Sequence, residues 1–197
     1  MEAKRRGLLI GVAFLASQSC GGVSAPQIPS VPSPPSNTAQ CGVERWFVKT
    51  LADADATRVD MLSVSNSSVS ALNAVTARCS GLPESRSFGE EFRVYEVTGI
   101  VQVTRNEDDR DVHIALADPN DATKTMVVEV VDPSCATTSP FLTTLSNARS
   151  QYQSLGSLTG RRVRVRGVGF YDFAHGQTGR SQSCIELHPV LSISLAP

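Results

Sequence analysis

Short runs in which apolar and polar residues alternate dominate the second half of the chain. In residues 111–118, DVHIALAD, apolar Val112, Ile114 and Leu116 recur at every second position. A period of two is typical of a β-strand with one buried face. We predict four further strands, at residues 91–106, 125–132, 161–172 and 184–195.

The period changes to three or four in residues 139–156, which predicts one amphipathic helix. Ser139 is a suitable N-cap, Pro140 suits the first helical position, and Gly156 is expected to end the helix. The apolar positions of this stretch are Phe141, Leu145, Ala148 and Tyr152.

The order of these elements predicts the fold. Three strands, a helix and two more strands is the order of the five-stranded OB barrel, in which the helix lies between strands three and four. Gly99, in the middle of the long first strand, has no Cβ to hinder a bend at a barrel corner. We therefore expect an all-β to α+β fold, with an OB-like barrel in residues 91–197 and an N-terminal extension. A generic α+β domain is the alternative.

Residues 41–90 form a less regular lead-in to this barrel. Residues 42–60 begin like a strand but show no clean alternation, so we expect a strand or an extended segment there. Residues 67–75, SSVSALNAV, predict a short helix opened by a serine cap. Residues 79–90 are expected to form a loop.

Residues 1–19 predict a secretory signal peptide. Basic residues 4–6 precede an apolar run at residues 7–16, and small residues follow. This run is about half of the roughly 20 residues that a membrane-spanning helix needs. The sequence LASQSC resembles the lipobox of bacterial lipoproteins, which predicts lipidation of Cys20, although Ser17 stands where leucine is usual. Ordinary cleavage before Cys20 is the alternative.

Residues 20–40 contain five prolines and no apolar period, which predicts a Pro/Ser-rich tether. The N-terminal region thus favours an exported protein, either a lipoprotein of the bacterial cell envelope or a secreted one. Contact with a membrane is expected through the lipid anchor only.

The remaining cysteines are even in number, as expected for disulfides in an oxidising compartment. Chain order favours the pairs Cys41 with Cys79 and Cys135 with Cys184, although four cysteines permit three pairings. No CxxC spacing occurs, and the single CxxxH spacing, from Cys184 to His188, has no second thiolate pair near it in the sequence, so a thiolate zinc site is the weaker alternative.

The net charge disfavours nucleic acid as a partner. Removing residues 1–19 takes away three basic residues and Glu2, which leaves 15 basic and 18 acidic residues and a formal charge of −3. A mildly acidic protein is a poor electrostatic match for a phosphate backbone.

Several motifs resemble a group of exported bacterial proteins with uncharacterised OB-like domains. They are ERWFVKTLADADA, VHIALADPND with TMVVEVVDPSCA, and above all GVGFYDFAHGQTG with IELHPVL, which together span roughly residues 44–195. The resemblance implies the barrel fold and export, and it implies no catalytic residue. Staphylococcal-type nucleases share the OB topology, but a shared fold does not confer function.

The stretch DFAHGQTGRSQSCIELHP, residues 172–189, holds the best candidate site. It connects the last two strands, and this connection is one of the two loops with which OB folds hold ligands. Imidazole and carboxylate groups gathered there suit a divalent metal ion or an acid and base pair. The candidate ligand-binding residues are Asp172, His175, Gln177, Glu186 and His188, joined by His113 from the second strand.

A purely structural reading of this stretch is the alternative. Gly176 and Gly179 suit the positive backbone angles of a turn, and the side chains of His175 and Gln177 suit hydrogen bonds to its backbone. Glu186 and His188 then form a surface pair or a satisfied buried pair.

Two charged segments suggest further contacts. The loop NEDDRD, residues 106–111, is the other OB ligand loop, and its four acids repel phosphate or suit calcium. The EF-hand spacing is absent, so a solvated hairpin tip is the preferred interpretation. The stripe of Arg162, Arg164 and Arg166 is a candidate polyanion site, with pairing to acids such as Glu129 as the alternative.

These observations favour a non-enzymatic, exported OB module that binds an unknown ligand or an envelope protein. The sequence requires no cofactor and identifies no metal. A divalent-metal-dependent, nuclease-like hydrolase is the first alternative, and polyanion binding is the second. Serine nucleophile elbow, Walker and HExxH motifs are all absent from the sequence, so no residue is assigned as catalytic.

Overall fold

The computed structural model describes residues 41–42 and 44–197. The predicted signal peptide, the predicted lipidation at Cys20 and the predicted tether lie outside the described residues. Among the helices of the described residues, none combines the length and the apolar character that crossing a lipid bilayer would take.

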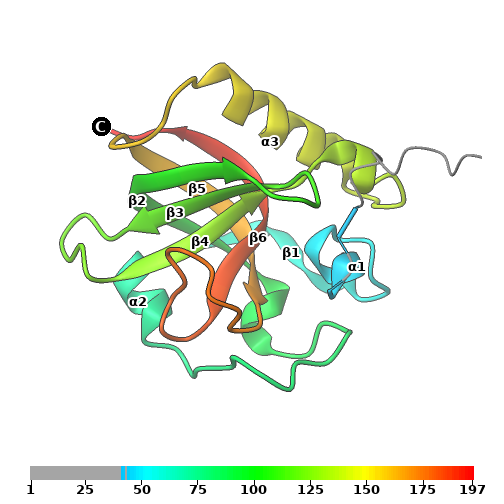
Figure 1. Ribbon diagram of the computed structural model, residues 1–197. Coiled ribbons are helices and arrows are strands. Elements are labelled where there is room, and N and C mark those ends of the chain that lie inside the picture. Colours follow the sequence, from blue (N-terminus) through cyan, green and yellow to red (C-terminus); the bar gives the residue numbers. More distant parts are fainter. Residues whose placement is uncertain (1–40, 43) are drawn as a thin grey trace, which may run out of the picture. The chain divides into compact units, whose positions relative to one another are not determined.

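Five strands close into a barrel, as predicted (Figure 1). The order around the barrel is β2, β3, β4, β6, β5 and back to β2. Only β4 and β6 pair in parallel within this ring. This is the OB order of strands, so the predicted fold class is confirmed. The strands are β2 (Arg93–Asn106), β3 (Val112–Ala117), β4 (Thr125–Val130), β5 (Arg162–Tyr171) and β6 (Ile185–Leu195).

The one long helix, α3 (Leu142–Ser154), lies between β4 and β5 in the chain, as predicted. Its buried residues are Leu145 and Ala148, and Gln151 Oε1 accepts a hydrogen bond from Ile193 N of β6 at 3.0 Å. The predicted N-cap is wrong, because Ser139 lies one turn before the helix, where its hydroxyl donates to Leu51 O.

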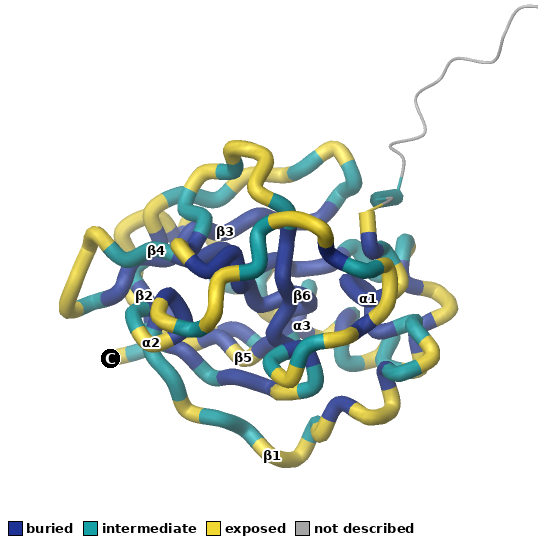
Figure 2. The backbone as a smooth tube through the Cα atoms, turned by 90° about the horizontal axis from the view of Figure 1, so that it is seen from below, coloured by how far each residue is buried: buried dark blue, intermediate teal, exposed yellow. Residues whose placement is uncertain are grey.

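The barrel interior is packed with the apolar face of each strand, and β3 and most of β6 are buried (Figure 2). Gly99 lies where β2 and β3 approach most closely, since a Cβ there would be 2.9 Å from Leu116 Cβ. A register shift follows in β2 between Val101 and Val103. The absence of a side chain at Gly99 therefore allows the strand to close the barrel.

The lead-in packs onto the barrel with short elements. The expected strand or extended segment at residues 42–60 is wrong, because a helical turn and a 3₁₀ turn occupy it. The predicted short helix is present, and its Ser68 hydroxyl accepts a hydrogen bond from Ala71 N at 3.0 Å. The elements are α1 (Trp46–Lys49), η1 (Ala56–Arg58), β1 (Asp60–Asn66), which pairs in parallel with β2, α2 (Val69–Asn73) and η2 (Gly89–Phe92).

A buried ion pair fixes α1 to the barrel. Arg45, just before α1, has no exposed side-chain surface, and its Nη1 donates to Glu91 Oε1 at 2.7 Å and to Tyr171 O at 2.7 Å. Glu91 also accepts hydrogen bonds from Ser87 N and Tyr171 N. The pair therefore joins three segments that are distant in sequence, and it determines where the first residues of the lead-in lie.

Two disulfides complete the attachment, but the pairing predicted from chain order is wrong. Cys41 bonds to Cys135 with a Cα–Cα distance of 5.5 Å, and Cys79 bonds to Cys184 with a Cα–Cα distance of 5.3 Å. Closure of the barrel brings β4 and β6 next to the lead-in. The order of the cysteines along the chain does not reveal these contacts, so it does not predict the pairing. Two disulfides are compatible with an exported protein.

Candidate functional site at the barrel mouth

A polar pocket of about 390 Å³ opens at one mouth of the barrel. Its walls are the β2–β3 connection, the β5–β6 connection and the start of the lead-in. Carboxylates dominate its lining, and Lys49 and Arg105 are its only permanently cationic side chains among the described residues. The lining comprises Gly42, Glu44, Lys49, Arg105, Glu107, Asp108, Asp109, His113, Glu129, Asp172, His175, Gly176, Gln177 and Glu186.

The structure brings five of the six candidate ligand-binding residues to this one pocket. Glu186 is almost fully buried at its floor, and His188, two residues further along β6, does not line it and is completely buried. The five lining residues are His113, Asp172, His175, Gln177 and Glu186. Their role in binding stays a prediction.

Sequence reasoning missed Lys49, Glu44 and the central role of Glu129. Lys49 and Glu44 come from the lead-in, whose helical turn was not predicted. Glu129 was considered only as a partner for arginines, although it is the one charged residue inside the apolar run TMVVEVV. A lone charge in a buried strand is rarely tolerated without a partner, so that position carried a usable signal.

The rim of the pocket is formed by a turn just after β5. His175 Nε2 lies 3.0 Å from Asp172 Oδ2, and Gln177 Nε2 donates to the same oxygen at 3.1 Å. Gln177 Oε1 accepts a hydrogen bond from His175 N, and Gly176 has a φ of 84°. These contacts agree with the structural reading of the turn, and they also hold the Asp172 carboxylate in one orientation.

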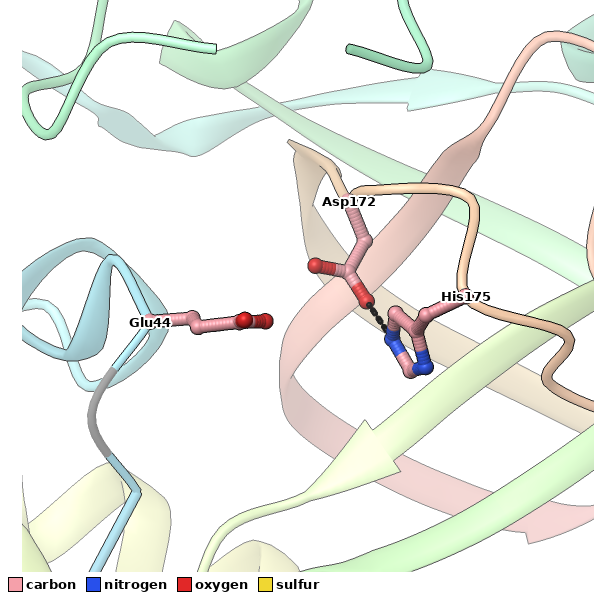
Figure 3. Close-up of side chains that lie close together, drawn as sticks. All are labelled: Glu44, Asp172 and His175. Carbon is pink, nitrogen blue, oxygen red and sulfur yellow. Dashed lines mark hydrogen bonds and ion pairs between the residues drawn. The ribbon is translucent and has the colours of Figure 1, made fainter. Parts of the chain in front are cut away.

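The second oxygen of that carboxylate, Asp172 Oδ1, is buried and has no hydrogen-bond partner among the described residues. Asp172 itself is 4% exposed. Glu44 extends toward this carboxylate from the opposite wall (Figure 3). Two acidic groups therefore face each other across the rim, with His175 beside them.

A chain of hydrogen bonds leads from the pocket into the barrel. His113 Nδ1 lies 3.1 Å from Glu129 Oε1, and His113 Nε2 lies 2.8 Å from Thr178 O. Behind them, His188 Nε2 lies 3.1 Å from Asp111 Oδ2. His188 Nδ1 is 3.0 Å from Glu129 Oε2 but is poorly aligned for a hydrogen bond, so this contact is mainly electrostatic.

The buried ionisable side chains in this series of contacts shift one another's pKa values. Burial opposes the charge of His188, but the hydrogen bond to Asp111 and the close contact with Glu129 outweigh this effect and raise its pKa to about 9. Burial likewise opposes the charge of Glu129, yet the hydrogen bond from His113 and the contact with His188 hold its pKa well below the ordinary value. Burial also opposes the charge of His113, but its hydrogen bonds to Glu129 and Thr178 O raise its pKa.

Glu186 behaves in the opposite way. Burial raises its pKa well above the ordinary value, and the nearby charges of Glu129 and Asp172 raise it further. Burial opposes the charge of Lys49, but attraction to Asp172 and Glu129 outweighs this effect and raises its pKa. The pocket therefore combines a carboxyl group whose surroundings favour the protonated form, a carboxylate whose surroundings favour the ionised form, and an ammonium group, which are the groups that ligand binding or proton transfer uses.

The raised pKa of His188 predicts that the protein loses stability as the pH rises. Unfolded histidine titrates near 6.5, so between about 6.5 and about 9 only the folded chain keeps this proton. The contribution, about 3 kcal/mol, is complete below pH 6.5 and lost above pH 9. Glu186 acts in the same direction, because its raised pKa also leaves the folded state with the extra proton.

Urea unfolding at pH 6 and pH 9.5 measures this effect. We expect wild type to be less stable at the higher pH and His188→Gln to show a much smaller difference. Leu62→Ser, at a residue that is 95% exposed, is the control and keeps the wild-type difference. Equal stability of wild type at both values would contradict the assignment of a charged His188.

The arginine stripe lies elsewhere, on the outer face of β5. Arg164 and Arg166 both pair with Glu96 of the neighbouring β2, with Arg164 Nε at 3.6 Å. The expected pairing of these arginines with Glu129 is wrong, because Glu129 lies on β4 and β4 is not next to β5 in the sheet. Arg162 and Arg164 line a smaller hollow of about 260 Å³ together with Glu96 and Asp118. The positive charge of the stripe is thus largely balanced by adjacent acids.

No protein-family model matches this chain, and no curated protein matches it. The resemblance of its HGQTG and IELHPVL motifs to exported OB-like proteins therefore stays a prediction.

Proposed function

We propose that this protein is an exported, non-enzymatic OB module that binds a small cationic ligand in the pocket at the barrel mouth. The observation that carries the proposal is the charge of the lining, where six carboxylates, besides Glu186 with its raised pKa, face two permanent cations. The six are Glu44, Glu107, Asp108, Asp109, Glu129 and Asp172.

Position and size support this choice. The pocket lies between the two connections with which OB folds commonly hold ligands. Its volume of about 390 Å³ is within the usual range for small-molecule sites. A concave surface with charges of one sign focuses the field and attracts ligands of the opposite sign. A protonated amine or a divalent cation fits this description, and a phosphate-rich polymer does not.

Export is part of the proposal. The signal-like residues 1–19 and the lipobox-like sequence before Cys20 support it, and the two disulfides are compatible with it. In this account the Pro/Ser-rich residues 20–40 link the membrane anchor to the barrel.

A metal-dependent hydrolase is the second candidate. The specific observation in its favour is the opposite pKa shifts of Glu186 and Glu129, which give an acid and a base in one pocket. The acidic lining disfavours a nuclease, since nucleic acid is repelled from it. Polyanion binding is weaker still, because Glu96 pairs with two of the three arginines and Asp118 lines the hollow beside Arg162 and Arg164.

The proposed function predicts that spermidine, a small polyamine, binds the full-length protein and that added salt weakens the binding. We expect Asp108→Asn/Asp109→Asn to raise the dissociation constant about fivefold, since each rim charge contributes about 0.5 kcal/mol. Isothermal titration calorimetry measures both effects.

The matched control for this titration is Glu84→Gln, which removes one exposed carboxylate away from the pocket. It should bind spermidine as wild type does. Absence of spermidine binding in wild type, or equal losses in the rim variant and the control, would remove the proposal. Hydrolysis of ester substrates that Glu186→Gln abolishes would favour the second candidate instead.

A further inference from the structure

Three groups of metal-ligating side chains lie at or behind the barrel mouth, and in each the potential ligand atoms lie within 4.8 Å of one another. They differ in access to solvent and in how far their atoms already bond to the protein. Only one group combines an open approach with a buried carboxylate oxygen that has no partner.

Two of the groups are already satisfied. In the first, both ring nitrogens of His113 are engaged, by Glu129 and by Thr178 O, and Glu107 pairs with Arg105 at 2.7 Å. In the second, Asp111, Glu129 and His188, every residue is buried and His188 supplies the compensating positive charge. Neither group offers an entry path and free ligand atoms together.

We propose that the third group, Glu44, Asp172 and His175, binds one divalent transition-metal ion of the zinc type. This inference rests on the proposed function, because it names one cation that the acidic mouth takes. The site joins the lead-in, the end of β5 and the β5–β6 turn (Figure 3).

The unpartnered oxygen of Asp172 points to a ligand. A buried carboxylate oxygen without a hydrogen bond carries a desolvation cost, and native proteins satisfy nearly all such groups. Asp172 is 4% exposed, and its Oδ1 faces the side from which Glu44 approaches (Figure 3). A cation between Asp172 and Glu44 satisfies this oxygen and removes the repulsion between the two carboxylates.

The ligand types select the class of metal. An imidazole nitrogen with two carboxylates suits zinc and its first-row neighbours, whereas calcium and magnesium prefer ligands that are all oxygen. Three protein ligands leave a fourth position open. Gln177 Nε2, which donates to Asp172 Oδ2 at 3.1 Å, supports the carboxylate from behind, as outer groups do in known metal sites.

The surrounding structure holds these side chains near one another without the metal. The buried ion pair of Arg45 with Glu91 holds the residue next to Glu44, and the Cys41–Cys135 disulfide holds Cys41. Asp172 N donates to Cys184 O at 3.0 Å, and the Gln177 contacts fix the turn. His175 has 55% of its side chain exposed, and its Nε2 lies 3.0 Å from Asp172 Oδ2, so the imidazole is accessible to an ion beside this carboxylate.

Titration of the metal-free, full-length protein with ZnCl2 tests the inference. We expect one zinc ion per chain by calorimetry, and more than tenfold weaker binding in both His175→Ala and Asp172→Asn. Cobalt(II) supplies an independent readout, since visible absorption bands reporting a nitrogen ligand should be lost in His175→Ala. Glu84→Gln is the control and should bind zinc as wild type does. His175 is exposed, so its substitution is not expected to affect folding.

The outcomes separate this inference from the proposed function. If zinc does not bind, or binds equally to wild type and to both ligand variants, the metal site is wrong. Should spermidine still bind in that case, and weaken in Asp108→Asn/Asp109→Asn, the acidic mouth remains a binding site for organic cations. If neither zinc nor spermidine binds, both proposals fall.

Discussion

Replacing Arg45 by alanine is expected to lower the free energy of unfolding by about 3 to 5 kcal/mol, because it leaves a buried charge without its partner. Glu91 has no exposed side-chain surface, and among the described residues Arg45 Nη1 is the only charged group bonded to its carboxylate. Arg45 also donates to Tyr171 O, so the substitution frees a carbonyl of β5 as well.

Urea unfolding of matched variants measures this loss. Arg45→Met keeps much of the packing of the side chain and isolates the charge, so it should still cost most of the effect. The control is Arg58→Ala, which breaks an exposed pair with Asp55 and should cost less than about 1 kcal/mol. A similarly small cost for Arg45→Ala would show that the pair does not stabilise the lead-in.

Removing the Cys79–Cys184 disulfide has the second large expected effect. Its cysteines are separated by 105 residues, and in the chain-entropy account a loop of this length contributes about 4 to 5 kcal/mol. We expect Cys79→Ser/Cys184→Ser to lower the unfolding midpoint strongly in thermal and urea denaturation. Reduction of wild type opens both disulfides and should therefore cause a larger loss.

The second disulfide offers a comparison with a different readout. Cys41→Ser/Cys135→Ser opens a loop of similar size, with a separation of 94 residues, and also releases the segment that carries Glu44. It should therefore lower stability by a similar amount and weaken zinc binding in addition. An oxidised wild type that unfolds like its reduced form would contradict a stabilising role for both bonds.

The barrel was predictable because its signals are local. Val112, Ile114 and Leu116 alternate along β3 and belong to the barrel core, and the buried Leu145 and Ala148 recur along α3, so each element reveals its core-facing residues within a few positions, although β3 is buried on both faces. The order of elements then leaves few closed topologies. The fold class follows from these patterns alone.

The lead-in and the disulfides were not predictable in the same way, because they depend on contacts between distant segments. Arg45 is buried only because Glu91, 46 residues away, neutralises it. The four residues of α1 are too few to show a helical period. The pairing of Cys41 with Cys135 likewise follows from barrel closure and not from chain order.

The candidate site was predictable in part. The OB topology places Asp172 and His175 on a ligand loop, and the pocket is at that place. Glu44 and Lys49 enter it from the lead-in, where no sequence pattern indicated their position. The lead-in therefore lines the pocket together with the barrel, and residues from both 41–90 and 91–197 form its walls.

The most direct test of a cation-binding mouth is a titration of the isotopically labelled, full-length protein with spermidine, followed by amide chemical shifts in NMR spectra. If spermidine binds in the pocket, we expect the chemical-shift changes to concentrate at the rim, in residues 107–109 and 175–177, and we expect the amides of the arginine stripe at residues 162–166 to be unaffected. Shifts spread evenly over the surface, or confined to that stripe, would contradict binding in the pocket.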